Sequence, residues 1–163
     1  MDNVRFEDLI NEIDTAFIET NKKMTGIDFT KCGSDELICK KVLSIMIKLN
    51  GSESGFIVMI ADYETAYIIA EAINCERPEN EVEVHNLFAE FANIFTGRAT
   101  SQFNKIHIHN QLYINPPLIF MHMMFEKFNG VKFTRSVNYM SHAGIIRLEI
   151  TISDGLDSRS NDF

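Results

Sequence analysis

Two polar side chains, Glu90 and Asn93, have the types and the spacing to act together on one small target. They are three residues apart, so on a helix they lie on the same face, whereas residues one or two apart would diverge. A carboxylate can hold a cation on a partner, and an amide can orient a water molecule through hydrogen bonds without titrating. The pair therefore indicates a site that binds a basic group and positions water. A solvated polar helix face explains the same spacing.

The helix that must carry this pair is predicted over residues 82–104. One apolar stripe runs along it and consists of Val84, Leu87, Phe88, Phe91, Phe95 and Ala99. At about 100° per residue, a second stripe falls on nearly the opposite side and consists of Asn86, Glu90, Asn93 and Gly97. Gly97 and nearby Ala89 would leave room for another protein's surface. We therefore expect Asn86, Ala89 and Gly97 to contribute to docking of a partner.

The remaining pattern predicts a sheet packed with helices. An amphipathic helix is expected over residues 5–24 with Gly26 as its stop, and a second helix begins after the capping residue Asp62. Strands are expected at 37–49, 55–61, 105–113, 118–128, 131–139 and 144–152, the first two forming a hairpin. The economical fold is a single α+β domain over residues 1–152, with an antiparallel-rich sheet, followed by a short polar tail at 153–163.

Composition limits the setting in which this domain acts. The chain has 163 residues, 45% of them apolar, and a net charge of -8, which gives no general attraction to nucleic acid. Its most apolar stretch, residues 55–73, is interrupted by three carboxylates and is a poor membrane span. The odd cysteine count, without a C-x-x-C pair, fits a reducing cytoplasm. We expect a cytoplasmic protein that binds neither nucleic acid nor membrane.

The run over residues 86–99 resembles the E-x-x-N-x-x-x-G signature helix of the CheC/CheX/FliY chemotaxis phosphatases. Glu90, Asn93 and Gly97 stand at the fixed positions, and the resemblance extends from the first helix to about residue 152. The CheX-like branch is the best match because one intact E-x-x-N occurs. The resemblance implies a phosphatase that hydrolyses the aspartyl phosphate of a CheY-type response regulator. The alternative is a noncatalytic CheX-like module that binds a receiver domain or a flagellar-switch component.

In that family the glutamate contacts a lysine of the phosphorylated receiver, and the asparagine orients the attacking water. By resemblance, Glu90 anchors and Asn93 catalyses. No cofactor is implied in this chain, and Mg²⁺ is expected on the receiver. Family members form dimers through their sheets, so a homodimer is also expected. Asn86 departs from the Asp or Ser that is frequent four residues before the glutamate, which leaves helix capping or partner contact open at that position.

Other residue groups compete with this interpretation. When the sequence is aligned with itself at a shift of 71 residues, Glu19, Lys22 and Gly26 align with Glu90, Asn93 and Gly97. A lysine cannot accept a hydrogen bond from water, so we predict no second catalytic pair at Glu19 and Lys22.

The histidines offer an alternative metal site. His107 and His109 would share one strand face, with His122 as a possible third metal ligand; we favour a polar strand face. We expect Cys32, Cys39 and Cys75 to be buried thiols and residues 121–124, a Met-rich run, to pack in a core or interface.

Overall fold

The first helix, α1 (Asn3–Thr25), has a well-defined cap at each end. The computed structural model describes residues 1–33, 41–121 and 130–153. At the start of α1, the Asp2 side chain accepts a hydrogen bond from the Arg5 backbone N–H at 2.9 Å. At its end, Gly26 adopts the left-handed conformation, with φ 71°, and its N–H donates to the Lys22 carbonyl at 3.0 Å. The predicted helix with Gly26 as its stop is confirmed.

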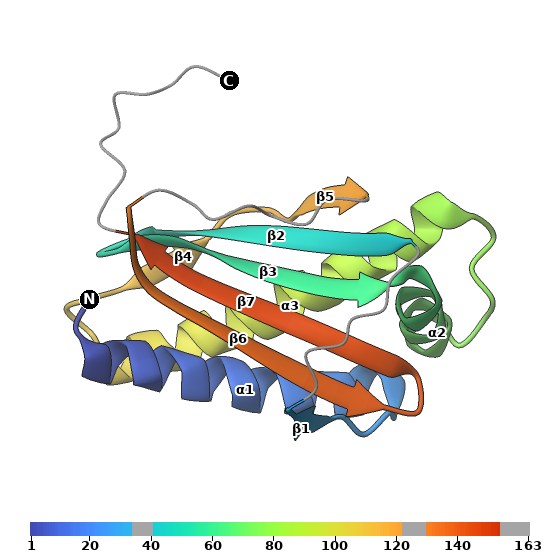
Figure 1. Cartoon of the computed structure of the whole chain (residues 1–163), viewed down its shortest axis with the longest axis horizontal. Coiled ribbons are helices and arrows are strands. Elements are labelled where there is room, and N and C mark those ends of the chain that lie inside the picture. Colours follow the sequence, from blue (N-terminus) through green and yellow to red (C-terminus); the bar gives the residue numbers. More distant parts are fainter. Residues whose placement is uncertain (34–40, 122–129, 154–163) are drawn as a thin grey trace, which may run out of the picture.

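In the described residues after α1, the chain forms a short strand, a hairpin, two helices, two short strands and a second hairpin. They are β1 (Thr30–Cys32), β2 (Val42–Gly51), β3 (Ser54–Asp62), α2 (Tyr63–Asn74), α3 (Glu81–Ile106), β4 (Leu112–Ile114), β5 (Leu118–Met121), β6 (Val131–Ser141) and β7 (Gly144–Ser153). In the described parts of the chain, seven strands form one antiparallel sheet in the order β1-β6-β7-β3-β2-β4, and β5 pairs with β2 beyond this path. Figure 1 shows α1 and α3 lying along the same face of this sheet. The predicted α+β fold is therefore confirmed.

The core lies between the helices and one face of the sheet. Because side chains alternate along a strand, one residue in two on β2, β3 and β7 points toward the helices and is buried. The ring of Phe17 on α1 is at the centre of an aromatic cluster. Ring centroids lie 4.3 Å away for Tyr139, 5.8 Å for Phe29, 5.8 Å for Phe91 and 5.5 Å for Phe95. This cluster joins α1 to both α3 and β6.

A polar group, Asp14, is enclosed beside this cluster. Its carboxylate accepts a hydrogen bond from the Tyr139 hydroxyl and pairs with the Lys31 ammonium group. Burial of the ring, with the neighbouring Asp14 carboxylate, raises the pKa of the Tyr139 phenol far above its ordinary value. The three side chains connect α1 to β6 and β1. Because Asp14 is 8% exposed, loss of its partners would leave a desolvated carboxylate.

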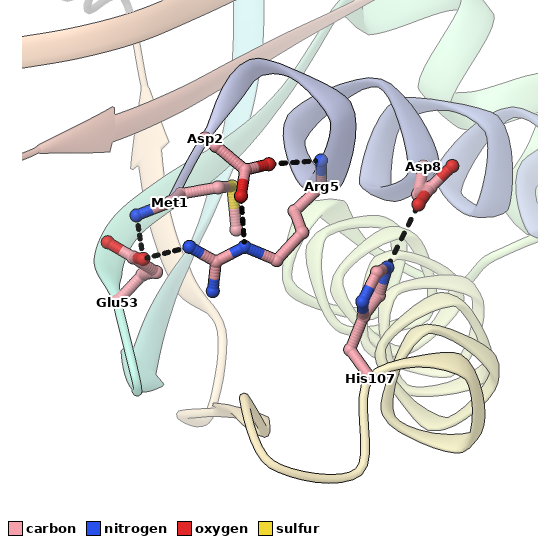
Figure 2. A network of polar contacts seen from close by, with 6 residues as sticks. All are labelled: Met1, Asp2, Arg5, Asp8, Glu53 and His107. Carbon is pink, nitrogen blue, oxygen red and sulfur yellow. Dashed lines mark hydrogen bonds and ion pairs between the residues drawn. The ribbon is translucent and has the colours of Figure 1, made fainter.

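The amino-terminal end of α1 is held at two places, as Figure 2 shows. Glu53, in the turn between β2 and β3, pairs with the Met1 amine and lies 3.7 Å from the Arg5 guanidinium. Asp8 meets His107 Nε2 at 3.0 Å, at the carboxyl end of α3. These contacts place α1 antiparallel to α3 and fix one end of the helix pair against the sheet.

Several boundaries differ from the sequence-based expectation. The strand predicted at 105–113 is wrong: α3 continues through Ile106, residues 107–110 form a turn, and β4 has three residues. Strand β1 was not predicted, because three residues carry almost no periodic signal. Of the strand expected at 118–128, residues 118–121 are β5, and the rest lies outside the described residues. Strand β7 includes Ser153, one residue beyond the expected domain end, and residues 154–163 of the tail also lie outside the described part.

No helix within the described ranges combines the length and apolarity that crossing a membrane requires. Cys75 is exposed and Cys32 half-buried, so the expectation of buried thiols is wrong for both, and Cys39 lies outside the described residues. Cys75 ends α2 in the left-handed conformation, with φ 58°. That position faces solvent, because it lies beyond the last packed turn of the helix.

Candidate active site

The helix α3 begins at a strong amino-terminal cap. The Asn80 side chain accepts a hydrogen bond from the Glu83 N–H at 3.1 Å, and the Glu79 N–H donates to the Glu83 carboxylate at 2.6 Å. Glu81 and Glu83 also place negative charge in the first turn, where the helix dipole favours it. Asn80 is therefore the cap of α3. Asn86 lies in the second turn, so the capping role left open for it is excluded.

One side of α3 is sealed in the core by aromatic residues. Val84, Phe88, Phe91, Phe95, Ala99 and Phe103 all have no solvent-exposed surface. Burial of this many large side chains on one stripe resists rotation of the helix about its axis, since each ring would have to leave a packed site. The opposite stripe is consequently presented in one fixed orientation. The predicted apolar stripe is confirmed, although Leu87 is half-buried.

The carboxyl-terminal half of α3 is attached to β4 through a side-chain amide. Asn104 donates from Nδ2 to the Leu112 carbonyl and accepts from the Leu112 N–H, each at 2.8 Å. Both bonds engage one buried residue, so the amide takes the place of a neighbouring strand for the N–H and the carbonyl of Leu112. With His107 and Asp8 at the end of the helix, this contact sets the position of α3 along the sheet.

The second stripe emerges on the solvent side of α3, as its spacing predicts. Asn86 and Glu90 are exposed, and Asn93 and Gly97 are half-buried. Within the residues that the structure describes, neither the Glu90 nor the Asn93 side chain forms a hydrogen bond or an ion pair. A carboxylate and an amide one turn apart, on a rigid helix and without internal partners, are available to bind groups from outside.

Gly97 and Ala89 differ in how much surface they can offer. A Cβ added at Gly97 would meet only the Cδ1 atom of Ile114, at 3.6 Å, which is an ordinary contact. The fold itself therefore does not require glycine there, although glycine in a helix interior costs about 1 kcal/mol relative to alanine. Ala89, expected to help in docking, is 5% exposed and belongs to the core. It can present little surface to a partner.

An ion pair borders the site on the α1 side, and sequence reasoning missed it. The Arg98 guanidinium donates to Glu19 Oε2 at 2.7 Å and to the Thr20 hydroxyl at 2.8 Å. Glu19 thus contacts α3, and Lys22 pairs with Asp28 at 2.5 Å. Gly26, which the shift of 71 residues placed beside Gly97, ends α1 instead of lying inside a helix. That Glu19 and Lys22 form no second catalytic pair stays a prediction.

The histidines do not have the arrangement that a metal site on a strand would need. His107 and His109 lie in the turn after α3, so the expected shared strand face is wrong, and His122 lies outside the described residues. His107 is turned toward α1, where it meets Asp8 and stacks near Phe103 with ring centroids 4.5 Å apart. Among the described residues, no three side chains of His, Cys, Asp or Glu converge on a common point.

The chain resembles known proteins both in sequence, through a family model, and in fold, through solved structures. The family model described as chemotaxis phosphatase CheX matches residues 43–131, more than half of the chain and all of α2 and α3. No curated protein sequence gives a match.

Solved structures share the fold at low sequence identity. A CheC-like superfamily protein from Shewanella sp. PV-4 has a TM-score of 0.77 at 20% identity, covering 94% of this chain and 99% of its own. Chemotaxis protein CheX from Vibrio vulnificus has a TM-score of 0.75 at 19% identity, covering 89% and 96%. CheX in the CheX-CheY-BeF3-Mg²⁺ complex from Borrelia burgdorferi has a TM-score of 0.70 at 22% identity, covering 89% and 97%.

Proposed function

Because the chain belongs to the chemotaxis phosphatase CheX family, we propose that it hydrolyses the aspartyl phosphate of a CheY-type response regulator. The Borrelia burgdorferi structure, in which a CheX of this fold is bound to CheY, supports a regulator of that type as the partner. The observation that carries the proposal is the pair Glu90 and Asn93 on the rigid helix α3, whose side chains have no partner among the described residues.

In this proposal α3 docks against the phosphorylation site of the receiver. Glu90 binds a lysine of the receiver, which fixes the height and rotation of the helix over the phosphoryl group. The Asn93 amide holds a water molecule in line with the phosphorus atom and the aspartyl oxygen. The water oxygen forms the new bond to phosphorus, the bond to the aspartyl oxygen breaks, and inorganic phosphate and a free carboxylate result.

Charge neutralisation in this reaction comes from the receiver. Its Mg²⁺ and its own phosphate-binding groups stabilise the transferring phosphoryl group, so this chain has to supply position and not a metal. A neutral amide suits the task, because it orients water through hydrogen bonds and does not repel the anionic phosphoryl oxygens. A carboxylate at the position of Asn93 would add such repulsion.

The direct test follows phosphate loss from purified CheY-type receivers charged with acetyl phosphate, with and without this protein. The proposal predicts that the protein accelerates the loss from at least one receiver. Binding of a receiver without acceleration would instead establish the noncatalytic module, in which α3 recognises a receiver or a flagellar-switch component. Neither binding nor acceleration with any receiver from the same genome would refute both.

The face of the sheet opposite α1 and α3 supports a second part of the proposal, that two copies associate. Met140 on β6 and Leu118 on β5 are 48% and 53% exposed on that face. Exposed apolar side chains on a flat sheet are suited to packing against a second sheet. This surface lies on the opposite side of the sheet from α3, so a homodimer would leave both candidate sites accessible.

A further inference from the structure

The edge strand β5 carries apolar side chains toward the side of the sheet on which α3 lies. Figure 1 shows β5 beside β2 at the edge of the sheet. Ile119 is paired with Ile45, and Met121 with Leu43, and directly paired residues project from the same face. Ile45 and Leu43 are completely or almost completely buried in the core. Ile119 and Met121 therefore project to the face that the helices cover.

These two side chains are only partly covered. Ile119 is 38% exposed and Met121 is 37% exposed, so α3, which contacts β5, leaves part of each side chain accessible to a partner. Ile114 of β4 projects to the same face, because it is paired with the buried Leu49, and it is half-buried. We refer to Ile114, Ile119 and Met121 as the apolar ledge.

The apolar ledge runs alongside the second stripe of α3. Ile114 lies beside Gly97, since a Cβ there would contact it at 3.6 Å. From Gly97 back to Glu90 the helix spans about 10 Å, at about 1.5 Å per residue. Ile114 and Ile119 are paired with Leu49 and Ile45 of β2. These two partners are four residues apart, which is about 13 Å along the strand at about 3.3 Å per residue. Glu90 and Asn93 are thus level with the ledge between Ile114 and Ile119.

The two flanks of the stripe differ in chemistry. On the α1 side, the Arg98 and Glu19 pair presents satisfied charges. On the β5 side, the ledge presents apolar carbon, and Asn93 lies one helical turn before Gly97, the residue of the stripe that lies beside Ile114. A partner that brings a phosphoryl group to the Asn93 amide from this flank passes over the ledge. Gly97 has no side chain, so a partner can approach the helix backbone more closely at this flank.

We propose that the apolar ledge is the second half of the docking site and is covered by apolar side chains that border the phosphorylated aspartate of the receiver. The inference rests on the proposed function and assigns the orientation of the bound receiver, tilted toward β5 and away from α1. Such a contact excludes bulk water from one side of the reacting group, while the ordered water on Asn93 remains.

The test measures steady-state phosphate release from a CheY-type receiver that the parent protein dephosphorylates, charged with acetyl phosphate. Ile119→Ser and Met121→Ser each raise KM about threefold, and together about tenfold, because each removes the exposed part of an apolar side chain from the interface. The kcat is unchanged, since Asn93 is untouched. Val131→Ser is the matched control: it is a strand residue that is 39% exposed, but it lies on β6, which β7 and β3 separate from β2 and β5.

Three outcomes overturn the inference, and they are distinguishable. If the parent accelerates phosphate release and the double variant keeps the parental KM while remaining folded, the ledge is not part of the interface and the proposed function stands. If the control Val131→Ser raises KM as much as the ledge variants, the effect is not specific to the ledge. If the parent accelerates phosphate release from no receiver, the proposed function itself is refuted and the inference with it.

Discussion

Replacing Gly97 with alanine should separate stability from docking. The residue lies inside α3, and the added Cβ meets only Ile114 Cδ1 at 3.6 Å, so the substitution introduces no clash within the chain. Alanine is favoured over glycine in a helix interior by about 1 kcal/mol. For a domain of this size, that gain raises the melting temperature by about 2–4 °C. The variant is therefore more stable than the parent.

The same methyl group should impair the reaction, because it occupies the gap beside Asn93 where the receiver approaches. Inserting a methyl group into a close-packed contact costs about 1–3 kcal/mol, which corresponds to a rise in KM of about fivefold or more. Docking then requires glycine at this position, although glycine makes the helix less stable. Glycine has this role where a partner must approach the backbone closely.

The assay pairs thermal unfolding with phosphate release for the parent and for Gly97→Ala. Asn11→Ala is the control, because Asn11 is exposed on α1 and its replacement also improves helix propensity. The control should be stabilised without a change in KM. A lower melting temperature for Gly97→Ala would refute the reasoning from the Ile114 contact, and an unchanged KM would refute the close approach of a receiver to this turn.

Three further outcomes follow from contacts elsewhere in the fold. Asn104→Ala should lower the unfolding free energy by about 2–3 kcal/mol in urea titration, because both hydrogen bonds to buried Leu112 are lost; a loss under 0.5 kcal/mol would contradict this. The pKa of the Tyr139 phenol is raised in the folded protein, so its contribution to the unfolding free energy is complete below about pH 10, where the unfolded phenol is protonated, and is lost at higher pH. Above that pH, the unfolding free energy of the parent should fall more steeply than that of Tyr139→Phe, by up to about 1.4 kcal/mol per pH unit. Parallel slopes for the two proteins would contradict this contribution of Tyr139. If two copies associate through the face of the sheet opposite α1 and α3, Met140→Glu should sediment as a monomer and the parent as a dimer; a monomeric parent would rule out the homodimer.

The helices could be predicted from the sequence because their signals are local. On α3, the spacing of Phe88, Phe91 and Phe95 settles the buried side, and the opposite stripe follows from the same periodicity. The end of α3 was misplaced because Lys105 and Ile106 carry no stop signal, and the β-branched isoleucine favoured a strand. Strands of three or four residues, such as β4, are defined by their pairing partners and not by their own pattern.

Contacts between segments that are distant in the sequence could not be predicted from residue spacing. The ion pair between Glu19 and Arg98 joins residues on two helices and depends on the antiparallel packing of α1 and α3. Burial of Ala89 likewise follows from where α3 meets its neighbours, since its position beside the second stripe did not reveal it. The apolar ledge needed the register of β5 against β2, which no spacing within residues 118–121 specifies. Motif spacing thus located the candidate pair, and tertiary packing defined its surroundings.

The most direct test of the proposed mechanism measures binding and turnover of one charged receiver on the parent and on Asn93→Ala, with Glu90→Ala alongside. The mechanism predicts that Asn93→Ala keeps its affinity for the receiver and loses the acceleration of phosphate release by about a hundredfold or more, because the in-line water is no longer held. Glu90→Ala should lose affinity as well. Parental turnover by Asn93→Ala would contradict the assignment of the water to this amide and, with it, the mechanism.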